Sequence, residues 1–235
     1  MTNYITDCIS RNGIVQLINA FAYSQYINQP FTVFFVIAWN KTEDWKPELL
    51  PARQEAFIRR LRAWYEREGI PFNYLYTVEC GEKLGTHSNF AVHLPQKDYR
   101  NKLTLFKKLV SELDAMVPGH TGNPCTVKVL PDRWTKLPKF YHHVNQRLGS
   151  LRYLMKGIDP DASFNNGGKR VRWCDQLGIR PSNQGTVIGP RYGVSQSLGT
   201  ACRSATGWQE LTAPAELLSA FPLPLEKRQP EQVAA

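Results

Sequence analysis

The sequence predicts an α+β fold built on an antiparallel sheet, and three observations indicate it. Residues 31–39 form a nearly continuous run of apolar, β-branched and aromatic residues, which is typical of a central strand. Residues 72–80 and 87–94 alternate between apolar and polar side chains, as strands with one buried face do. Other stretches repeat apolar residues every three or four positions, which is the spacing of an amphipathic helix.

The first part of the chain is predicted to form a helix, a strand and a second helix. Residues 13–27 have the pattern of an amphipathic helix and precede the apolar strand 31–39. Pro51 then opens a helix that ends near Gly69, since proline is accepted in a first turn and glycine often follows a helix end. The two faces of this helix are apolar (Phe57, Leu61, Trp64) and basic (Arg59, Arg60, Arg62).

The two alternating strands should pair with each other. The connector between them is a short loop that contains two glycines, Gly81 and Gly85, and such a loop favours a hairpin. A helix over 101–117, a short strand over 126–130 and a helix over 144–158 follow. The order strand, helix, strand, strand, helix, strand resembles a ferredoxin-like (RRM-like) arrangement, in which helices cover one face of the sheet. We expect the other face to be open for a ligand.

Four regions are expected along the chain. They are an N-terminal extension (1–30), the sheet domain (31–158), a basic and irregular C-terminal segment (159–221) and a disordered tail (222–235).

Composition narrows the class of protein. The chain has 235 residues, of which 42% are hydrophobic, and this is enough for one sizeable core. Lys and Arg outnumber Asp and Glu by 29 to 20, which favours an acidic partner such as nucleic acid, although solubility alone would also explain it. The five cysteines show no C-x-x-C spacing, and no apolar run is long enough to span a membrane. We therefore expect a cytoplasmic protein with no membrane partner.

One polar face of the predicted hairpin carries candidate metal ligands. If Glu79 lies opposite His87, their side chains are about 5 Å apart, and Asn89 follows two residues along on the same face. This mixed set of oxygen and nitrogen donors suits Mg²⁺ or Mn²⁺. His93 shares the face but lies about 20 Å from His87, too far for the same ion. The alternative is an ordinary solvated strand face.

A candidate nucleophile lies about seventy residues further on. Tyr153 and Lys156 are three residues apart, so in a helix they share one face. A lysine beside a tyrosine stabilises the phenolate that forms when the hydroxyl attacks. The alternative is an interfacial tyrosine next to a solvated lysine.

Taken together, these segments resemble the HUH endonuclease superfamily, and within it the single-tyrosine (Rep-like) initiators of rolling-circle replication. The resemblance is carried by the strand 31–39, the segment 79–95 and the Tyr-x-x-Lys helix, in that order, and it covers about residues 31–158. Relaxases and some transposases are cousins that use the same chemistry.

The resemblance implies a nickase that acts on single-stranded DNA at a plasmid or phage replication origin. Tyr153 would attack a phosphodiester and form a 5′-phosphotyrosine, and the ester would later join a second strand. Glu79, His87 and Asn89 would hold Mg²⁺ or Mn²⁺ against the phosphate, and Lys156 would place the phosphate or the metal, or stabilise the phenolate. The chain has no Walker A motif, so a host helicase would unwind the DNA for a host polymerase.

The segment 79–95 departs from the HUH endonuclease pattern in one place. It reads His87-Ser88-Asn89 where the family has His-hydrophobic-His, so Asn89 is a weaker ligand and Ser88 should weaken core packing. His142 or His143 would be a substitute ligand. A catalytically inactive nucleic-acid-binding module on the same fold is therefore an open alternative, as is a relaxase or transposase.

The C-terminal segment combines cations with aromatic residues, which is how single strands are held without reading their sequence. The candidate DNA-binding residues are Lys169, Arg170, Arg172, Trp173, Arg191 and Tyr192. The alternative is a solvated basic loop.

Overall fold

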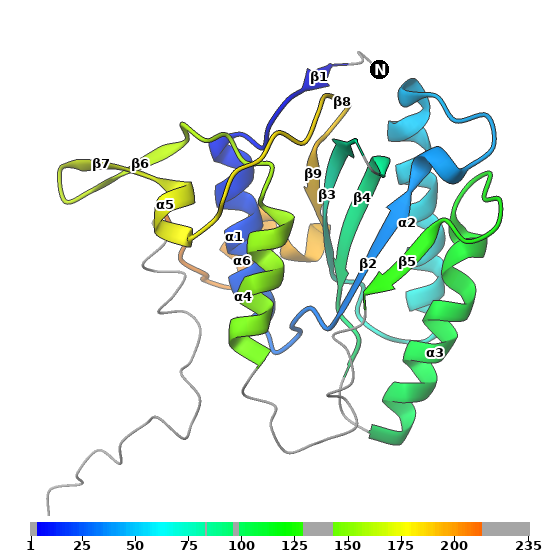
Figure 1. The fold of residues 1–235 in the computed structure, drawn as a ribbon. Coiled ribbons are helices and arrows are strands. Elements are labelled where there is room, and N and C mark those ends of the chain that lie inside the picture. The colour runs from blue at the N-terminus through cyan, green and yellow to red at the C-terminus, as the bar shows by residue number, and fades with distance from the viewer. Residues whose placement is uncertain (1–3, 83, 96–98, 129–142, 213–235) are drawn as a thin grey trace, which may run out of the picture.

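A five-stranded antiparallel sheet forms the centre of the computed structural model, which describes residues 4–82, 84–95, 99–128 and 143–212 (Figure 1). Its strands lie in the order β5, β2, β4, β3, β9. Their bounds are β2 Val33–Ala38, β3 Tyr74–Gly81, β4 Gly85–Val92, β5 Cys125–Lys128 and β9 Tyr192–Val194. The first four are the predicted strands, while β9 comes from the segment that was expected to be irregular.

Two short strand pairs lie outside this sheet. Residues near the N-terminus pair with the C-terminal segment, as β1 (Ile5–Thr6) with β8 (Val187–Ile188). The second pair is a hairpin of β6 (Ser163–Asn166) and β7 (Lys169–Arg172). Neither pair was predicted from the sequence. Strands this short do not show a clear alternation of apolar and polar side chains.

The described residues form six α-helices beside the sheet. They are α1 Arg11–Tyr26, α2 Leu50–Arg67, α3 Tyr99–Met116, α4 His143–Leu154, α5 Trp173–Leu177 and α6 Thr200–Ala205. The first three match the predicted helices to within a few residues. The prediction that the fourth helix continues to Ile158 is wrong. After Leu154 the backbone continues in tighter turns, in which the amides of Lys156 and Ile158 donate to carbonyls three residues back, and the Gly157 carbonyl accepts a hydrogen bond from the Ile9 amide (2.8 Å).

Helices α2 and α3 cover one face of the sheet with an aromatic and aliphatic core. Phe35 and Phe90 from neighbouring strands stack with ring centroids 5.2 Å apart, and Phe57 of α2 packs onto both rings. All three rings are buried, so this face is an ordinary hydrophobic core.

The expected weakness at Ser88 on this face is wrong. Ser88 is fully buried, but its hydroxyl accepts a hydrogen bond from the indole N–H of Trp39 (2.8 Å) and donates one to the Gln54 side chain (2.6 Å). A buried hydroxyl with both bonds made costs little. Ser88 therefore links a strand-end tryptophan to helix α2.

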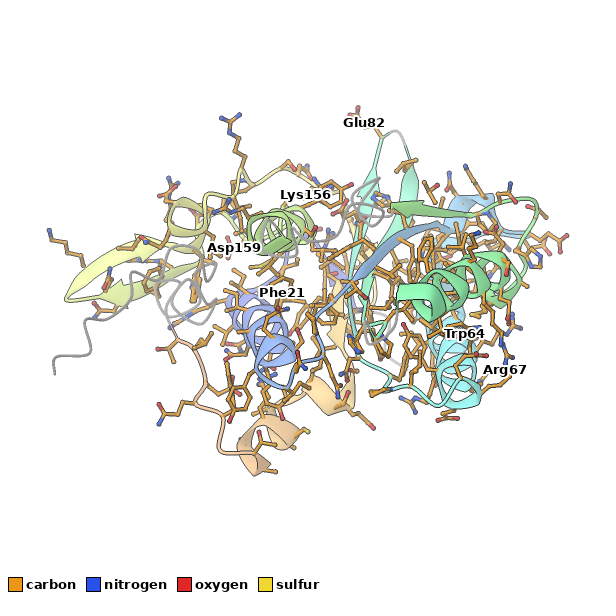
Figure 2. The ribbon with its side chains drawn as sticks, turned by 90° about the horizontal axis from the view of Figure 1, so that it is seen from below. Phe21, Trp64, Arg67, Glu82, Lys156 and Asp159 are labelled. Atoms are coloured by element: carbon orange, nitrogen blue, oxygen red, sulfur yellow. The ribbon has the colours of Figure 1, made fainter. Side chains whose placement is uncertain are left out.

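The second face of the sheet was expected to be open, and it is covered over part of its length. A second core joins α1 and α4 to Leu75 and Ala91 of the sheet. In Figure 2, Phe21 of α1 and Trp64 of α2 lie on opposite sides of the strands. Helix α1, in the predicted N-terminal extension, and Trp173, in the predicted C-terminal segment, both contribute to this second core. The predicted tail, 222–235, lies outside the described residues.

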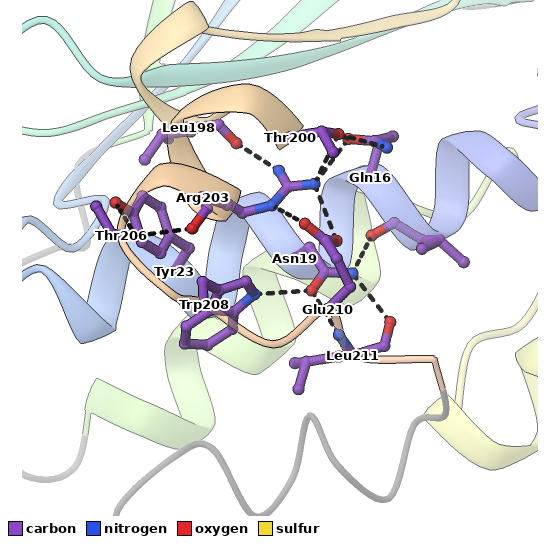
Figure 3. Close-up of polar contacts among 11 residues, drawn as sticks. Gln16, Asn19, Tyr23, Leu198, Thr200, Arg203, Thr206, Trp208, Glu210 and Leu211 are labelled. Carbon is purple, nitrogen blue, oxygen red and sulfur yellow. Dashed lines mark hydrogen bonds and ion pairs between the residues drawn. The ribbon is translucent and has the colours of Figure 1, made fainter.

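A network of hydrogen bonds and an ion pair joins the C-terminal segment to α1 (Figure 3). Arg203 is fully buried, and its guanidinium donates to both carboxylate oxygens of Glu210 (2.6 and 3.0 Å) and to Gln16 of α1 (3.0 Å). Asn19, also buried, binds Trp208 and Leu211. These contacts hold the end of the described chain in a fixed place. In the described parts of the chain, no helix combines the length and the apolar content that crossing a bilayer requires.

Candidate catalytic site on the second sheet face

The strand pairing places Glu79 directly opposite His87, which is the register that the predicted metal site was conditional on. One step along the same face, Thr77 lies opposite Asn89. All four side chains are more than 95% buried. The register is fixed by the hairpin, whose turn residue Gly85 has a φ of +58°, a conformation that favours glycine. Two adjacent strand pairs therefore gather four polar side chains on one buried patch.

The carboxylate of Glu79 lies between two basic side chains. Its Oε2 atom is 2.9 Å from Nε2 of His87 and 2.8 Å from Nζ of Lys156. The other ring nitrogen of His87 is 2.9 Å from the Gly85 carbonyl oxygen, so both neighbours of the imidazole are hydrogen-bond acceptors. Burial by itself would raise the pKa of Glu79, but the hydrogen bonds from His87 and Lys156 outweigh it and hold this pKa below its usual value. Glu79 is thus a charged carboxylate in the interior.

Lys156 connects this carboxylate to Tyr153. It lies in the turn that follows α4, and its ammonium is 4.1 Å from the centre of the Tyr153 ring. In Figure 2, Lys156 lies beside the end of α4, on the way to the sheet. Burial lowers the pKa of Lys156, but the hydrogen bond and charge of Glu79 raise it by more, so the pKa lies above its usual value. Lys156 is therefore positively charged at neutral pH.

Tyr153 lies at the surface of the protein. Its side chain is 40% exposed, in contrast to its helix neighbours Leu151 and Leu154, which are buried in the second core. A phenol at the surface with an ammonium against its ring can be reached by a large molecule.

Several atoms of the buried patch have unmet hydrogen-bonding capacity. Among the described residues, no partner is found for Oε1 of Glu79, for the hydroxyl of Thr77, or for either amide atom of Asn89. Buried polar atoms without partners are rare in proteins and each costs about 1–3 kcal/mol. Thr77 was missed from the sequence, although its place two residues before Glu79 on the same strand face was the signal that could have found it.

The unpartnered atoms fit a hard divalent cation. A carboxylate, an amide and a hydroxyl oxygen are the donors that Mg²⁺ and Mn²⁺ prefer. The described residues contain no cluster of three or more His, Cys, Asp or Glu side chains arranged to hold a metal, so Glu79 and Asn89 would be the main ligands. His87 could join them only if Nε2 released its contact with Glu79.

Three other histidines occur in the segments that carry the motifs. His93 is buried at the far end of β4, where its Nδ1 is 2.8 Å from the Pro30 carbonyl, so it serves the fold and not this patch. His142 lies outside the described residues. His143 is the first residue of α4, and its side chain is not among those described.

The predicted DNA-binding residues fall into two groups, and three of them do not form the expected surface. Trp173 is fully buried against Phe164, with ring centroids 4.9 Å apart, so no base can stack on it. Arg191 is buried too, and its guanidinium donates to main-chain carbonyls, among them that of Thr6 (2.8 Å). Tyr192 is half-buried in β9 with its ring close to Gly13 of α1. The sequence could not show the burial of Arg191 and Tyr192 because their contacts with Thr6 and Gly13 join distant segments.

The other three residues lie on the β6–β7 hairpin. Lys169, Arg170 and Arg172 are exposed, and Arg172 forms an ion pair with Asp175 (2.8 Å). Cations and aromatic rings, which alternate in the sequence, are therefore separated in space.

No family model, no curated protein and no solved structure matches the chain. The likeness to HUH endonucleases accordingly depends on the motifs named above, and the function has to be inferred from the site itself.

Proposed function

We propose that this protein is a metal-dependent enzyme that nicks and joins single-stranded DNA, with Tyr153 as the nucleophile. One observation supports this most directly: Lys156 contacts both the Glu79 carboxylate and the Tyr153 ring. The end of the tyrosine helix therefore lies against the face that carries Glu79 and His87, which this chemistry needs.

The sheet order supports the same proposal. From β2 to β5 the elements run strand, helix, strand, strand, helix, strand, and the strands lie in the order β5, β2, β4, β3. We infer a ferredoxin-like (RRM-like) frame, to which this chain adds β9 at one edge and α1 and α4 on the second face. In HUH endonucleases the metal motif and the tyrosine helix belong to such a frame.

The residues would divide the reaction as follows. The Tyr153 hydroxyl attacks the phosphorus and loses its proton to water, while the ammonium of Lys156 stabilises the phenolate. The bond to the 3′ oxygen breaks, and that oxygen takes up a proton. The 5′-phosphotyrosine retains the energy of the broken bond for rejoining. A divalent ion held by Glu79 and Asn89 would supply charge neutralisation at the phosphate.

The test is the formation of a covalent adduct. The full chain is incubated with Mn²⁺ and labelled single-stranded oligonucleotides from its own replicon, and a denaturing gel separates protein–DNA adducts. We expect an adduct that disappears with Tyr153→Phe and with chelator. Tyr26→Phe is the matched control, because Tyr26 is also an exposed helical tyrosine. An undiminished adduct with Tyr153→Phe would exclude this nucleophile.

A second candidate is a nucleic-acid-binding module without catalysis. It is favoured by the ion pair that Lys156 already makes with Glu79 and by the occupation of both ring nitrogens of His87. This candidate predicts salt-sensitive DNA binding that Tyr153→Phe leaves intact, with no adduct in Mn²⁺ or Mg²⁺. Asn89→His adds the missing imidazole. If it creates an adduct where the wild type gives none, the site is a weakened form of an active one.

The chemistry alone does not fix the biological role. We infer the initiation of rolling-circle replication of a plasmid or phage, with host helicase and polymerase as partners. A relaxase or a transposase would use the same site. A circular substrate carrying the replicon origin separates these roles, because only an initiator supports its replication by host proteins.

A further inference from the structure

The main chain around Lys156 is held by segments that are distant in the sequence. Lys156 lies in the turn after α4, where its amide makes only a long hydrogen bond to the Tyr153 carbonyl (3.3 Å). Its own carbonyl accepts from the Ser182 amide (2.9 Å), and the next carbonyl, of Gly157, accepts from the Ile9 amide (2.8 Å). A lysine side chain is long and flexible, so the place of its ammonium depends on the main chain that these two segments hold.

The buried guanidinium of Arg191 joins both of these segments to the sheet. It donates to the carbonyls of Thr6 in β1 (2.8 Å) and of Gly185, and it makes longer contacts (3.4 Å) with the carbonyls of Gln184 and Val78. A buried charge is costly unless its hydrogen bonds are made, and the planar guanidinium has donors that point in several fixed directions. Arg191 therefore holds three separate segments of main chain at one point.

The same loop is attached to the strand of the buried carboxylate. On one side of Glu79, the Cys80 amide donates to the Gln184 carbonyl (2.7 Å). On the other side, the Val78 amide donates to the Arg191 carbonyl (2.7 Å). One short stretch of chain therefore binds both the strand that carries the carboxylate and the turn that carries the ammonium.

We propose that Arg191 is a positioning residue for the contact between Lys156 and Glu79. Its guanidinium holds β1 and the loop 182–185 together against β3, and these two segments place the turn that contains Lys156. The inference rests on the proposed function, in that this contact orients the ammonium beside Tyr153. It also gives a role to a cation that the sequence had assigned to DNA and that the fold buries.

The test is a double-mutant cycle on stability, measured by urea denaturation of the full chain in chelator. Arg191→Lys keeps the charge and removes the planar fork, and Lys156→Met removes the ammonium. We expect Lys156→Met to lower the folding equilibrium constant about tenfold in the wild type, because a hydrogen bond to a buried carboxylate is lost, and less than about twofold in Arg191→Lys. Equal factors in the two backgrounds would show that Arg191 stabilises the fold without placing Lys156, and would overturn the proposal.

A pair of glycine variants makes the same test without altering the guanidinium. Gly185 and Gly122 have nearly the same positive φ (+65° and +64°), so alanine strains the backbone equally at both. A Cβ atom at Gly185 would overlap the Cys80 carbonyl oxygen and force the loop away from β3, whereas one at Gly122 would meet no described atom within 4 Å.

The effect of Lys156→Met should nearly disappear in Gly185→Ala and remain about tenfold in the control Gly122→Ala. A tenfold effect in both would mean that the loop does not place Lys156. Should one of the two test backgrounds, Arg191→Lys or Gly185→Ala, fail to fold, the other decides the question.

Adduct formation gives a separate measurement. Arg191→Lys should slow it about tenfold at saturating oligonucleotide, with oligonucleotide affinity near the wild type, because a small displacement of the ammonium affects the reaction more than binding. A lower affinity with an unchanged rate would contradict a positioning role. If even the wild type forms no adduct but the coupling in stability is seen, the proposed catalysis fails while the placement of Lys156 by Arg191 stands.

Discussion

Two buried asparagines, Asn19 and Asn89, have opposite surroundings. Asn19 on α1 makes all four hydrogen bonds that its amide allows: its nitrogen donates to the carbonyls of Val15 and Leu211, and its oxygen accepts from Trp208 and the Leu211 amide (Figure 3). Asn89 on β4 is 2% exposed, and neither of its amide atoms has a partner among the described residues.

The difference distinguishes buried polar groups that stabilise the fold from buried polar groups that are available to a ligand. A buried amide that makes all of its hydrogen bonds fixes the positions of its partners. A buried amide with no bond costs stability and gives none in return, so its presence needs another reason. Two carboxylates, the partly exposed Glu210 and the buried Glu79, repeat the contrast. Glu210 binds Arg203 through both oxygens, whereas one oxygen of Glu79 has no partner among the described residues.

The largest effect on stability is expected from Asn19→Leu. The substitution keeps the volume but leaves the Trp208 indole and both main-chain groups of Leu211 without their partner. We expect a loss of about 3 kcal/mol in the free energy of unfolding, measured by urea denaturation. DNA binding per folded molecule should be unchanged. A loss below about 0.5 kcal/mol would mean that this network does not hold the C-terminal segment.

Ser88→Ala tests a second satisfied group, next in sequence to Asn89 but on the other face. The Trp39 indole N–H and the Gln54 carbonyl oxygen would each lose their partner in the core. We expect a loss of about 2 kcal/mol, because buried groups left unpaired cost about 1–3 kcal/mol. The measurement is again urea denaturation, and Mn²⁺ affinity should not change. A neutral result would show that the two partners reach each other or water without Ser88.

Glu79→Gln should change the pH dependence of stability, measured in chelator. The pKa of Glu79 is lowered in the folded state, so its contribution is present above the unfolded pKa near 4.5 and is lost as the pH falls through the folded value. The pKa of Lys156 is raised, so the same ion pair contributes below 10.5 and is lost as the pH rises through the folded value.

The wild type should therefore be more stable than Glu79→Gln between these limits, and the two curves should meet in strong acid and in strong alkali. The difference at neutral pH should be smaller than that of Ser88→Ala, because the Lys156 side chain is 23% exposed and keeps some access to water. Parallel curves over the whole range would show that Glu79 does not titrate through this pair.

The sequence predicted the features that depend on residues close together in the chain. Strand alternation and a short loop predicted the hairpin and the polar face that Glu79 and His87 share, because strand period and loop length are local properties. It did not predict that α4 ends at Leu154, that Arg191 is buried or that Ser88 is satisfied. The last two depend on a distant partner, which is Thr6 for Arg191 and Trp39 for Ser88. The contact of Lys156 with Glu79 is likewise tertiary.

Asn89→Leu is expected to have the smallest effect on stability and the most informative one on the site. Leucine has a similar volume and no polar atoms, so it removes two unpartnered groups and should stabilise the protein by about 1 kcal/mol in chelator. Mn²⁺ affinity, measured by calorimetry, should fall about tenfold, because a ligand oxygen is lost. Asn89→Asp should do the reverse, binding Mn²⁺ more tightly while lowering stability in chelator through repulsion with Glu79. If Asn89→Leu destabilises the fold as Asn19→Leu does, Asn89 belongs to the core and the contrast between the two asparagines is broken. If it stabilises the fold and weakens the metal, the buried patch is kept for binding at the expense of stability.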